Sequence, residues 1–147
     1  MKREMEQQDV IEVLKNKEEL LAEYEQKKYA HMKEIERLNS DIKRLKESPI
    51  VDEKIETICK EEMVLRDMYQ ESLKEVLAVE SCINYIWYYY LQLPQEMKLI
   101  LEELYVKKNG WTFAVNTIRG SKTKLCQLKN AGLDKILRQM KGVNISL

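Results

Sequence analysis

Glycine and proline are scarce in this sequence, whose 147 residues contain four glycines and two prolines. The glycines all lie in the last third of the chain, and the prolines are Pro49 and Pro94. Because glycine and proline interrupt α-helices most strongly, the first 93 residues contain a single helix-breaking residue. This composition predicts long helices over that part of the chain.

Cysteine and histidine are also few. The three cysteines, Cys59, Cys82 and Cys126, are widely spaced and form no Cys-x-x-Cys pair, and His31 is the only histidine. This pattern excludes a disulfide framework and a zinc site built from Cys and His, and it suggests no other cofactor. We expect reduced, partly buried thiols, which are typical of a cytoplasmic protein, and a structural role for His31.

Long apolar segments are missing as well. The longest aromatic and apolar run, residues 85–91, is too short to cross a bilayer, and residues 1–6 lack the apolar core of a signal peptide. We therefore expect a cytoplasmic location and no membrane partner. Tyr85, Tyr88 and Tyr89 are expected to pack against an adjoining domain, with stacking on nucleic-acid bases as the alternative.

The net charge of zero hides an uneven distribution. Residues 1–104 carry 16 Lys and Arg against 24 Asp and Glu, whereas residues 105–147 carry 9 against 1. A compact basic module beside an acidic helical region is typical of a nucleic-acid binder with a separate assembly element. A solvated basic face is the alternative interpretation.

Apolar residues recur with a seven-residue period on both sides of residues 48–49, which predicts two long helices joined by a short turn. The seams are Leu14, Leu21, Ile35 and Ile42 with Val10, Tyr24, Leu38 and Leu45, and then Ile55, Tyr69, Val76, Ile83 and Tyr90 with Val51, Ile58, Leu65, Val79, Ile86 and Leu93. We expect an all-α protein with a long antiparallel helical hairpin or coiled coil over residues 1–92, turning near 47–50, and a small domain over residues 93–147. Leftover apolar positions predict a homodimer or a larger homo-oligomer.

Shorter helices are predicted in the last third of the chain. An apolar helical period runs from residue 97 to about 108, and a second short helix is expected over residues 111–118. Residues 119–120 break it, and Ser121 is a natural N-cap because its hydroxyl can accept from a backbone N–H two or three residues later. The side chains expected to face inward from the following helix are Leu125, Leu128, Gly132, Ile136 and Met140.

Residues 119–125, RGSKTKL, contain elements of a phosphate-binding loop. A nucleotide-binding loop needs a Gly, four residues and then Gly-Lys-Ser/Thr, but here Lys122 follows Ser121, and Val115 stands where the first Gly is required. The order of residues therefore excludes a nucleotide-binding loop, and the phosphates of DNA remain as the candidate ligand. No Ser/His/Asp or Cys/His set is present, because His31 lies in a different predicted element, so we expect no enzymatic activity.

The order of residues in this region resembles a known pattern. It is carried by Leu93-Pro94, Leu101, Tyr105-Val106, Trp111-Thr112, Ala114-Val115, Ile118, Ser121, Leu125 and Leu128. Residues 85–140 thereby resemble sigma-factor region 4, a helix-turn-helix domain, and are most similar to late-gene transcriptional regulators of the ArpU/RinA type from Gram-positive phages and prophages. The chain departs from that family at Val115 in place of a small Ala, at Arg119 in place of the turn Gly, and at Lys129 in place of a His.

The resemblance implies sequence-specific binding of double-stranded DNA and regulation of transcription. A step of about 100° per residue places Thr123, Gln127, Asn130 and Asp134 opposite the buried face of the last helix. The expected base-reading residues are Thr123, Lys124, Gln127 and Asn130, and the expected phosphate contacts are Lys107, Lys108, Arg119, Ser121 and Lys122. The alternatives are a sigma-like factor that binds RNA polymerase, and a coiled-coil structural or adaptor protein without DNA binding.

Overall fold

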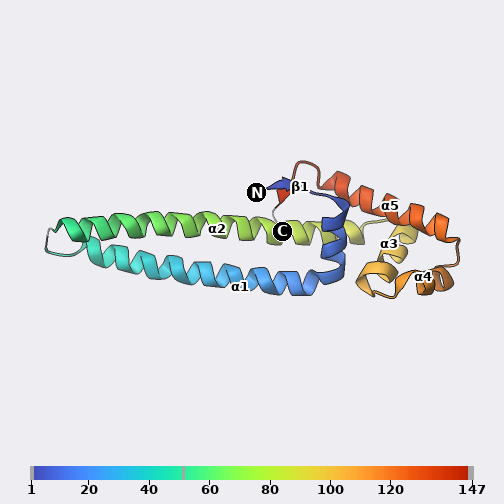
Figure 1. The fold of residues 1–147 in the computed structure, drawn as a ribbon, viewed down its shortest axis with the longest axis horizontal. Coiled ribbons are helices and arrows are strands. Elements are labelled where there is room, and N and C mark those ends of the chain that lie inside the picture. Colours follow the sequence, from blue (N-terminus) through green and yellow to red (C-terminus); the bar gives the residue numbers. More distant parts are fainter. Residues whose placement is uncertain (1, 51, 146–147) are drawn as a thin grey trace. The chain divides into compact units, whose positions relative to one another are not determined.

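The computed structural model describes residues 2–50 and 52–145, and helices account for most of them (Figure 1). The elements in chain order are β1 (Arg3–Glu4), α1 (Gln7–Lys46), α2 (Glu53–Leu91), α3 (Gln95–Leu101), the π-helix η1 (Glu102–Val106), α4 (Gly110–Ile118), α5 (Lys122–Gln139) and β2 (Asn144–Ile145). The predicted all-α fold class is confirmed. The sequence did not indicate the two short strands, which pair antiparallel with Arg3 opposite Ile145.

The chain forms two compact units, and each contains parts of both long helices. The arm comprises Ala22–Ala78, and the basal unit comprises Met1–Leu21 together with Val79–Leu147. This division differs from the expected boundary after residue 92, because the beginning of α1 and the end of α2 belong to the same compact unit as α3, α4 and α5. The first helix is also not continuous as expected, because Asn16 has a non-helical φ of −130° and ψ of 28°, which kinks α1 inside the basal unit.

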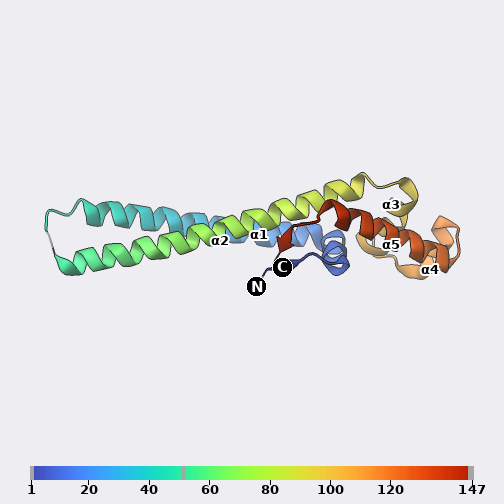
Figure 2. The same ribbon diagram turned by 90° about the horizontal axis from the view of Figure 1, so that it is seen from above.

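In the arm, α1 and α2 run antiparallel and side by side (Figures 1 and 2). The expected seams of α1 are confirmed there by the burial of Tyr24, Leu38 and Ile42. One expected seam of α2 is wrong in the arm, because Ile58 is 46% exposed and Leu65 is 39% exposed. Val51, the first member of that seam, lies outside the described residues.

The buried stripe of α2 keeps one heptad position along the helix and changes the other. Tyr69, Val76 and Ile83 share the constant position, whereas the second position changes from Cys59 in the arm to Val79 and Ile86 in the basal unit. A straight α-helix has 3.6 residues per turn, so a strict seven-residue pattern drifts about 20° per heptad. Over the 39 residues of α2 this drift moves burial onto neighbouring heptad positions.

Polar residues in the arm also bridge the two helices. Arg66 Nη1 donates a hydrogen bond to Asn39 Oδ1 at 3.3 Å. The ring of His31 lies 5.7 Å from the ring of Tyr69, measured between centroids. His31 therefore packs within the hairpin, in agreement with a structural role.

The core of the basal unit brings together α3, η1, α4 and α5. Its buried centre consists of Ile100, Leu104, Ala114 and Leu125, and the half-buried Trp111 packs against this cluster. These helices bury the faces that the apolar period predicts, with one residue of α4 and one of α5 at the centre. The core fixes the orientation of α5 and therefore of its outward face.

Gly132 allows α5 to approach α3 closely. A Cβ atom at this position would lie 3.1 Å from Leu101 Cδ1 and 3.3 Å from Met97 Cβ. Both separations are shorter than ordinary carbon contacts, which lie near 3.5–4.0 Å. The missing side chain therefore has a packing reason, although glycine weakens a helix interior by about 1 kcal/mol relative to alanine.

The helix expected over residues 97–108 begins and ends about two residues earlier, and it changes form. It continues from α3 into η1 and ends at Val106. Beyond this end, Asn109 Nδ2 donates to Glu103 Oε2 at 2.8 Å and Lys107 Nζ donates to Glu103 Oε1 at 3.4 Å. The bond from Asn109, with the further help of Lys107, lowers the pKa of the Glu103 carboxyl. Glu103 is buried and thus anchors the loop between η1 and α4.

The tyrosines at the end of α2 correct another expectation. Tyr85 and Tyr88 are 57% and 54% exposed, so neither packs against the adjoining domain as expected, whereas the half-buried Tyr89 lies beside Pro94 and Lys135. Helical geometry explains this, because Ile83, Ile86 and Tyr90 face the core and residues 85 and 88 fall on the opposite side. Burial also raises the pKa of Tyr90 to about 12.

Candidate nucleic-acid interface

A tight turn joins α4 to α5. Arg119 follows the last residue of α4 and adopts a φ of 45°, in the left-handed region that favours glycine. Ser121 then caps α5, because its Oγ accepts a hydrogen bond from the Lys124 backbone N–H at 3.1 Å. The predicted N-cap is confirmed, and Arg119 rather than Gly120 occupies the strained position of the turn.

The outward face of α5 begins immediately after this cap. Thr123, Lys124, Gln127 and Asn130, the four residues expected to read bases, are all exposed on it. The opposite face is buried through Leu125, Gly132, Leu133, Ile136 and the following Met140. Leu133 is also buried, although the apolar period of the sequence did not indicate it. Leu128, which was expected to face inward, is half-buried.

The expected phosphate contacts fall into two groups along the chain. Arg119, Ser121 and Lys122 surround the start of α5, and all three are exposed. Lys107 and Lys108 lie in the loop between η1 and α4. The structure thus brings the first group together around one helix N-terminus, whose free N–H groups favour an anion.

The two loop lysines differ in their surroundings. Lys107 Nζ lies 3.8 Å from Glu102 Oε1 and also contacts Glu103, so its charge already has carboxylate partners. Lys108 is exposed and holds a φ of 57°, a left-handed conformation. Lys108 is therefore the stronger of the two candidates for contact with an external phosphate.

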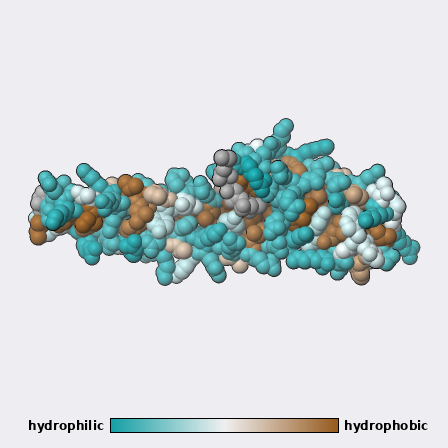
Figure 3. All heavy atoms as spheres, in the orientation of Figure 1, coloured by the Kyte–Doolittle hydropathy of each residue, from teal (hydrophilic) through white to brown (hydrophobic). Residues whose placement is uncertain are grey.

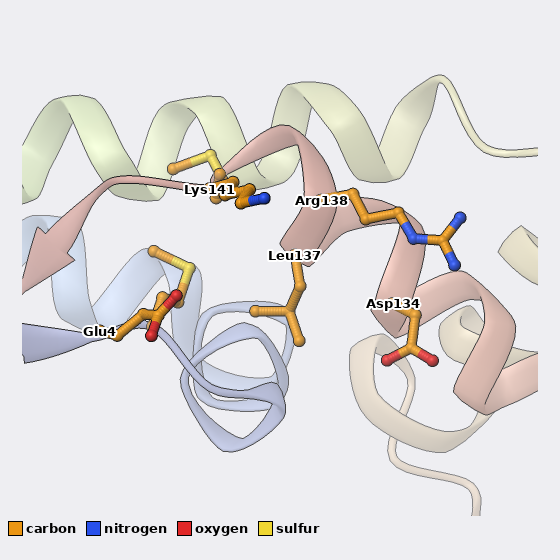
Figure 4. Close-up of a pocket in the computed structure, with 7 residues that line it drawn as sticks. Glu4, Asp134, Leu137, Arg138 and Lys141 are labelled. Carbon is orange, nitrogen blue, oxygen red and sulfur yellow. The ribbon is translucent and has the colours of Figure 1, made fainter.

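Asp134 has a partner that the sequence did not suggest. Its Oδ1 accepts a hydrogen bond from Gln7 Nε2 at 2.7 Å. Leu137 of α5 points toward the N-terminal segment, and Glu4 lies on the opposite side of the same hollow (Figure 4). Asp134 is thus exposed on the outward face as expected, but it binds the N-terminal segment within the basal unit.

The N-terminal segment is itself fixed by an ion pair. Arg3 donates from both terminal guanidinium nitrogens to the two carboxylate oxygens of Asp9, which is 4% exposed. The Glu6 backbone N–H also donates to Asp9 Oδ2 at 2.8 Å, as in one half of a capping box. The hydrogen bond from Arg3 is the main cause of the lowered pKa of Asp9.

Among residues 2–50 and 52–145, no group of three or more His, Cys, Asp or Glu side chains is placed to hold a metal ion. None of the described helices is long and apolar enough to cross a membrane.

The three cysteines, Cys59, Cys82 and Cys126, are all free thiols. Desolvation by burial raises the pKa of the Cys82 thiol to about 11.

Comparisons of the chain with protein-family models, with curated proteins and with solved structures found no match. The resemblance of residues 85–140 to sigma-factor region 4 therefore stays a prediction from their residue order. What the structure contributes is a capped helix with an exposed polar face and basic residues around its first turn.

Proposed function

We propose that the protein binds double-stranded DNA in a sequence-specific manner and regulates transcription, and that its targets are phage or prophage genes, as the resemblance implies. The observation that carries this proposal is the exposed polar face of α5 directly after the Ser121 cap. It combines side chains that can contact base edges with a helix N-terminus that can hold a phosphate.

The side chains on this face suit the major groove. Gln127 and Asn130 each carry the donor and acceptor that pair with adenine, and Lys124 can donate to the acceptors of guanine. The methyl group of Thr123 can contact the thymine methyl. Asn130 Nδ2 lies 3.9 Å from Cys126 Sγ, a weak contact that leaves its carbonyl oxygen available to a base.

The charge of the region supports DNA as the partner. Asp134 is the only acidic residue among residues 105–147, and nine basic residues accompany it. If about five phosphates are neutralised, the logarithm of affinity should fall against the logarithm of salt concentration with a slope of roughly −4 to −5. A salt titration with double-stranded DNA tests this, and a flat response would exclude the proposal.

Selection of bound fragments from random or genomic DNA tests sequence specificity. The expected result is an enriched motif whose affinity exceeds that of scrambled DNA at the same salt concentration. The proposed function also implies a cytoplasmic location. If all fragments bind alike, the protein coats DNA without reading it.

A second candidate function, binding to RNA polymerase, is favoured by the exposed Tyr85 and Tyr88 of the basal unit. Exposed aromatic side chains are enriched in protein interfaces. Capture of the polymerase in the absence of promoter DNA would support a sigma-like factor. Failure to bind either partner at low salt would instead support a structural or adaptor protein.

We also propose that two chains pair through the arm. Five apolar side chains of α2 remain exposed there, namely Ile58, Val64, Leu65, Met68 and Leu77. The first four lie within about 120° of one another around the helix. Figure 3 shows that apolar residues, in brown, lie among hydrophilic ones on the surface of the molecule. A second copy would cover such a stripe and would present two DNA-binding domains to a palindromic operator.

A further inference from the structure

Two lysines of α5 approach the same indole ring. Lys122 Nζ lies 5.6 Å from the centroid of the Trp111 ring, and Lys129 Nζ lies 5.9 Å from it. Both distances fall within the range in which an ammonium group is attracted by an aromatic ring. Lys129 is half-buried and was not among the residues expected to contact DNA.

Trp111 is held in place by the core. It stands at the start of α4 and packs against the cluster that contains Ile100, Leu104 and Ala114. A half-buried ring fixed on one side by packing has little freedom to turn away from the lysines. The indole therefore restrains two long side chains that would otherwise be mobile.

The two ammonium groups have no ion-pair partner among the described residues. Lys17 provides a contrast, because its Nζ lies 4.5 Å from the ring of Trp87 and also 3.9 Å from Glu18 Oε1. Each ammonium group lies within 6 Å of the same ring centroid, and an anion placed near both would offset the repulsion between the two charges.

The position of the cluster connects it to the candidate interface. Lys122 and Lys129 are seven residues apart, so they lie within about 20° of each other around α5. Lys122 immediately follows the Ser121 cap, where the helix N-terminus also favours negative charge. An ammonium group over a ring keeps N–H donors on its other side, and these can donate to phosphate oxygens.

We propose that Lys122 and Lys129 together bind one phosphate of the DNA backbone and that Trp111 is the positioning residue for both. This inference rests on the proposed DNA binding and adds a site to it. The site makes no contact with base edges, so it should strengthen binding to every sequence alike.

Indole fluorescence provides a direct test on the full chain. The protein has two tryptophans, so a Trp87→Phe background leaves Trp111 as the only indole. Titration with duplex DNA should shift or quench the Trp111 emission, and Lys129→Gln should reduce this response. An emission that stays constant while DNA binds would overturn the proposal.

Salt titrations of variants provide the second readout. Lys129→Gln should weaken binding to operator and scrambled DNA equally and should reduce the salt slope by up to about 0.9. Trp111→Phe should keep most of the affinity, whereas Trp111→Leu should behave like Lys129→Gln. Lys135→Gln is the matched control, because Lys135 lies on α5 beside Tyr89 and Pro94, in a different groove. If Trp111→Leu fails to fold, Lys129→Gln alone decides the test.

Titration with inorganic polyphosphate separates this proposal from the proposed function. If polyphosphate shifts the Trp111 emission but duplex DNA does not bind, the site takes an anion and the proposed function fails. If DNA binds but Lys129→Gln and Trp111→Leu both keep the parental salt slope, the proposed function stands and this site is excluded. If neither duplex DNA nor polyphosphate binds, both proposals fail.

Discussion

The side-chain amide of Gln7 donates a hydrogen bond to Asp134 Oδ1 at 2.7 Å and so connects residues 127 positions apart in the chain. The bond joins the first turn of α1 to the outward face of α5 within the basal unit. It places the N-terminal segment beside the second half of α5. The first half, which carries Gln127, keeps its exposed face.

Two substitutions at Asp134 separate its bond from its charge. Asp134→Asn keeps an acceptor for Gln7 and should leave stability nearly unchanged, whereas Asp134→Ala should lower the free energy of unfolding by about 0.5–1.5 kcal/mol. Both variants should bind scrambled DNA more tightly, because each removes a negative charge from α5. Chemical denaturation and DNA titration measure these effects. Equal destabilisation by both variants would contradict the role of the hydrogen bond.

Asp9 should make stability depend on pH in the acid range. The hydrogen bond from Arg3 lowers its pKa in the folded state below the unfolded value of about 3.9. The contribution is therefore complete above about pH 5 and is lost as the pH falls through the folded pKa. Asp9→Asn should lower stability by about 1–3 kcal/mol at pH 7 and should flatten the decline below pH 5. Urea unfolding from pH 3 to pH 7 tests this, and parallel pH curves for the two proteins would contradict it.

Gln127 and Lys108 should affect DNA binding in opposite ways. Gln127 is exposed, so Gln127→Ala should leave thermal stability unchanged but lower discrimination at one base pair by about 1–3 kcal/mol. Lys108→Ala should weaken all sequences alike and reduce the salt slope by about one. Salt titrations on a selected operator and on scrambled DNA measure both. Loss of folding in Gln127→Ala would mean that α5 is rotated from the orientation described.

Gly132 should tolerate no branched side chain. Gly132→Val would push its side chain against Leu101 and Met97, so we expect a loss of about 1–3 kcal/mol in the free energy of unfolding. Gly120→Ala is the control, because a Cβ there would meet Leu125 at an ordinary 3.6 Å. Thermal unfolding compares the two. A Gly132→Val protein as stable as the parent would show that α3 and α5 can move apart freely.

Charges on the exposed stripe of the arm should separate paired chains without unfolding them. The double change Leu65→Glu and Met68→Glu should give a monomeric mass in light scattering at tens of micromolar, with helical content retained. Ile86→Asp should instead unfold the basal unit, because Ile86 is buried and a carboxylate there would lose its hydration. If the parental chain is already monomeric at this concentration, the arm is not an assembly element.

Local features of the fold and of the candidate site could be predicted from the sequence. The cap at Ser121, the burial of Leu125 and the exposure of Gln127 depend on residues within one or two helical turns. The long helices could likewise be predicted, because the scarcity of Gly and Pro favours helix formation in each turn by itself. These features need no knowledge of what packs against the helix.

Only the tertiary structure decided which long-range contacts form. The burial of Cys59 in place of Ile58 follows from the rotation at which α2 meets α1, and the period of a single helix does not contain that rotation. The bond from Gln7 to Asp134 and the approach of Lys129 to Trp111 likewise join different elements. Such contacts depend on how two helices fit their side chains together. The sequence therefore determined the helices and their polar faces, and packing determined which of those faces stay open.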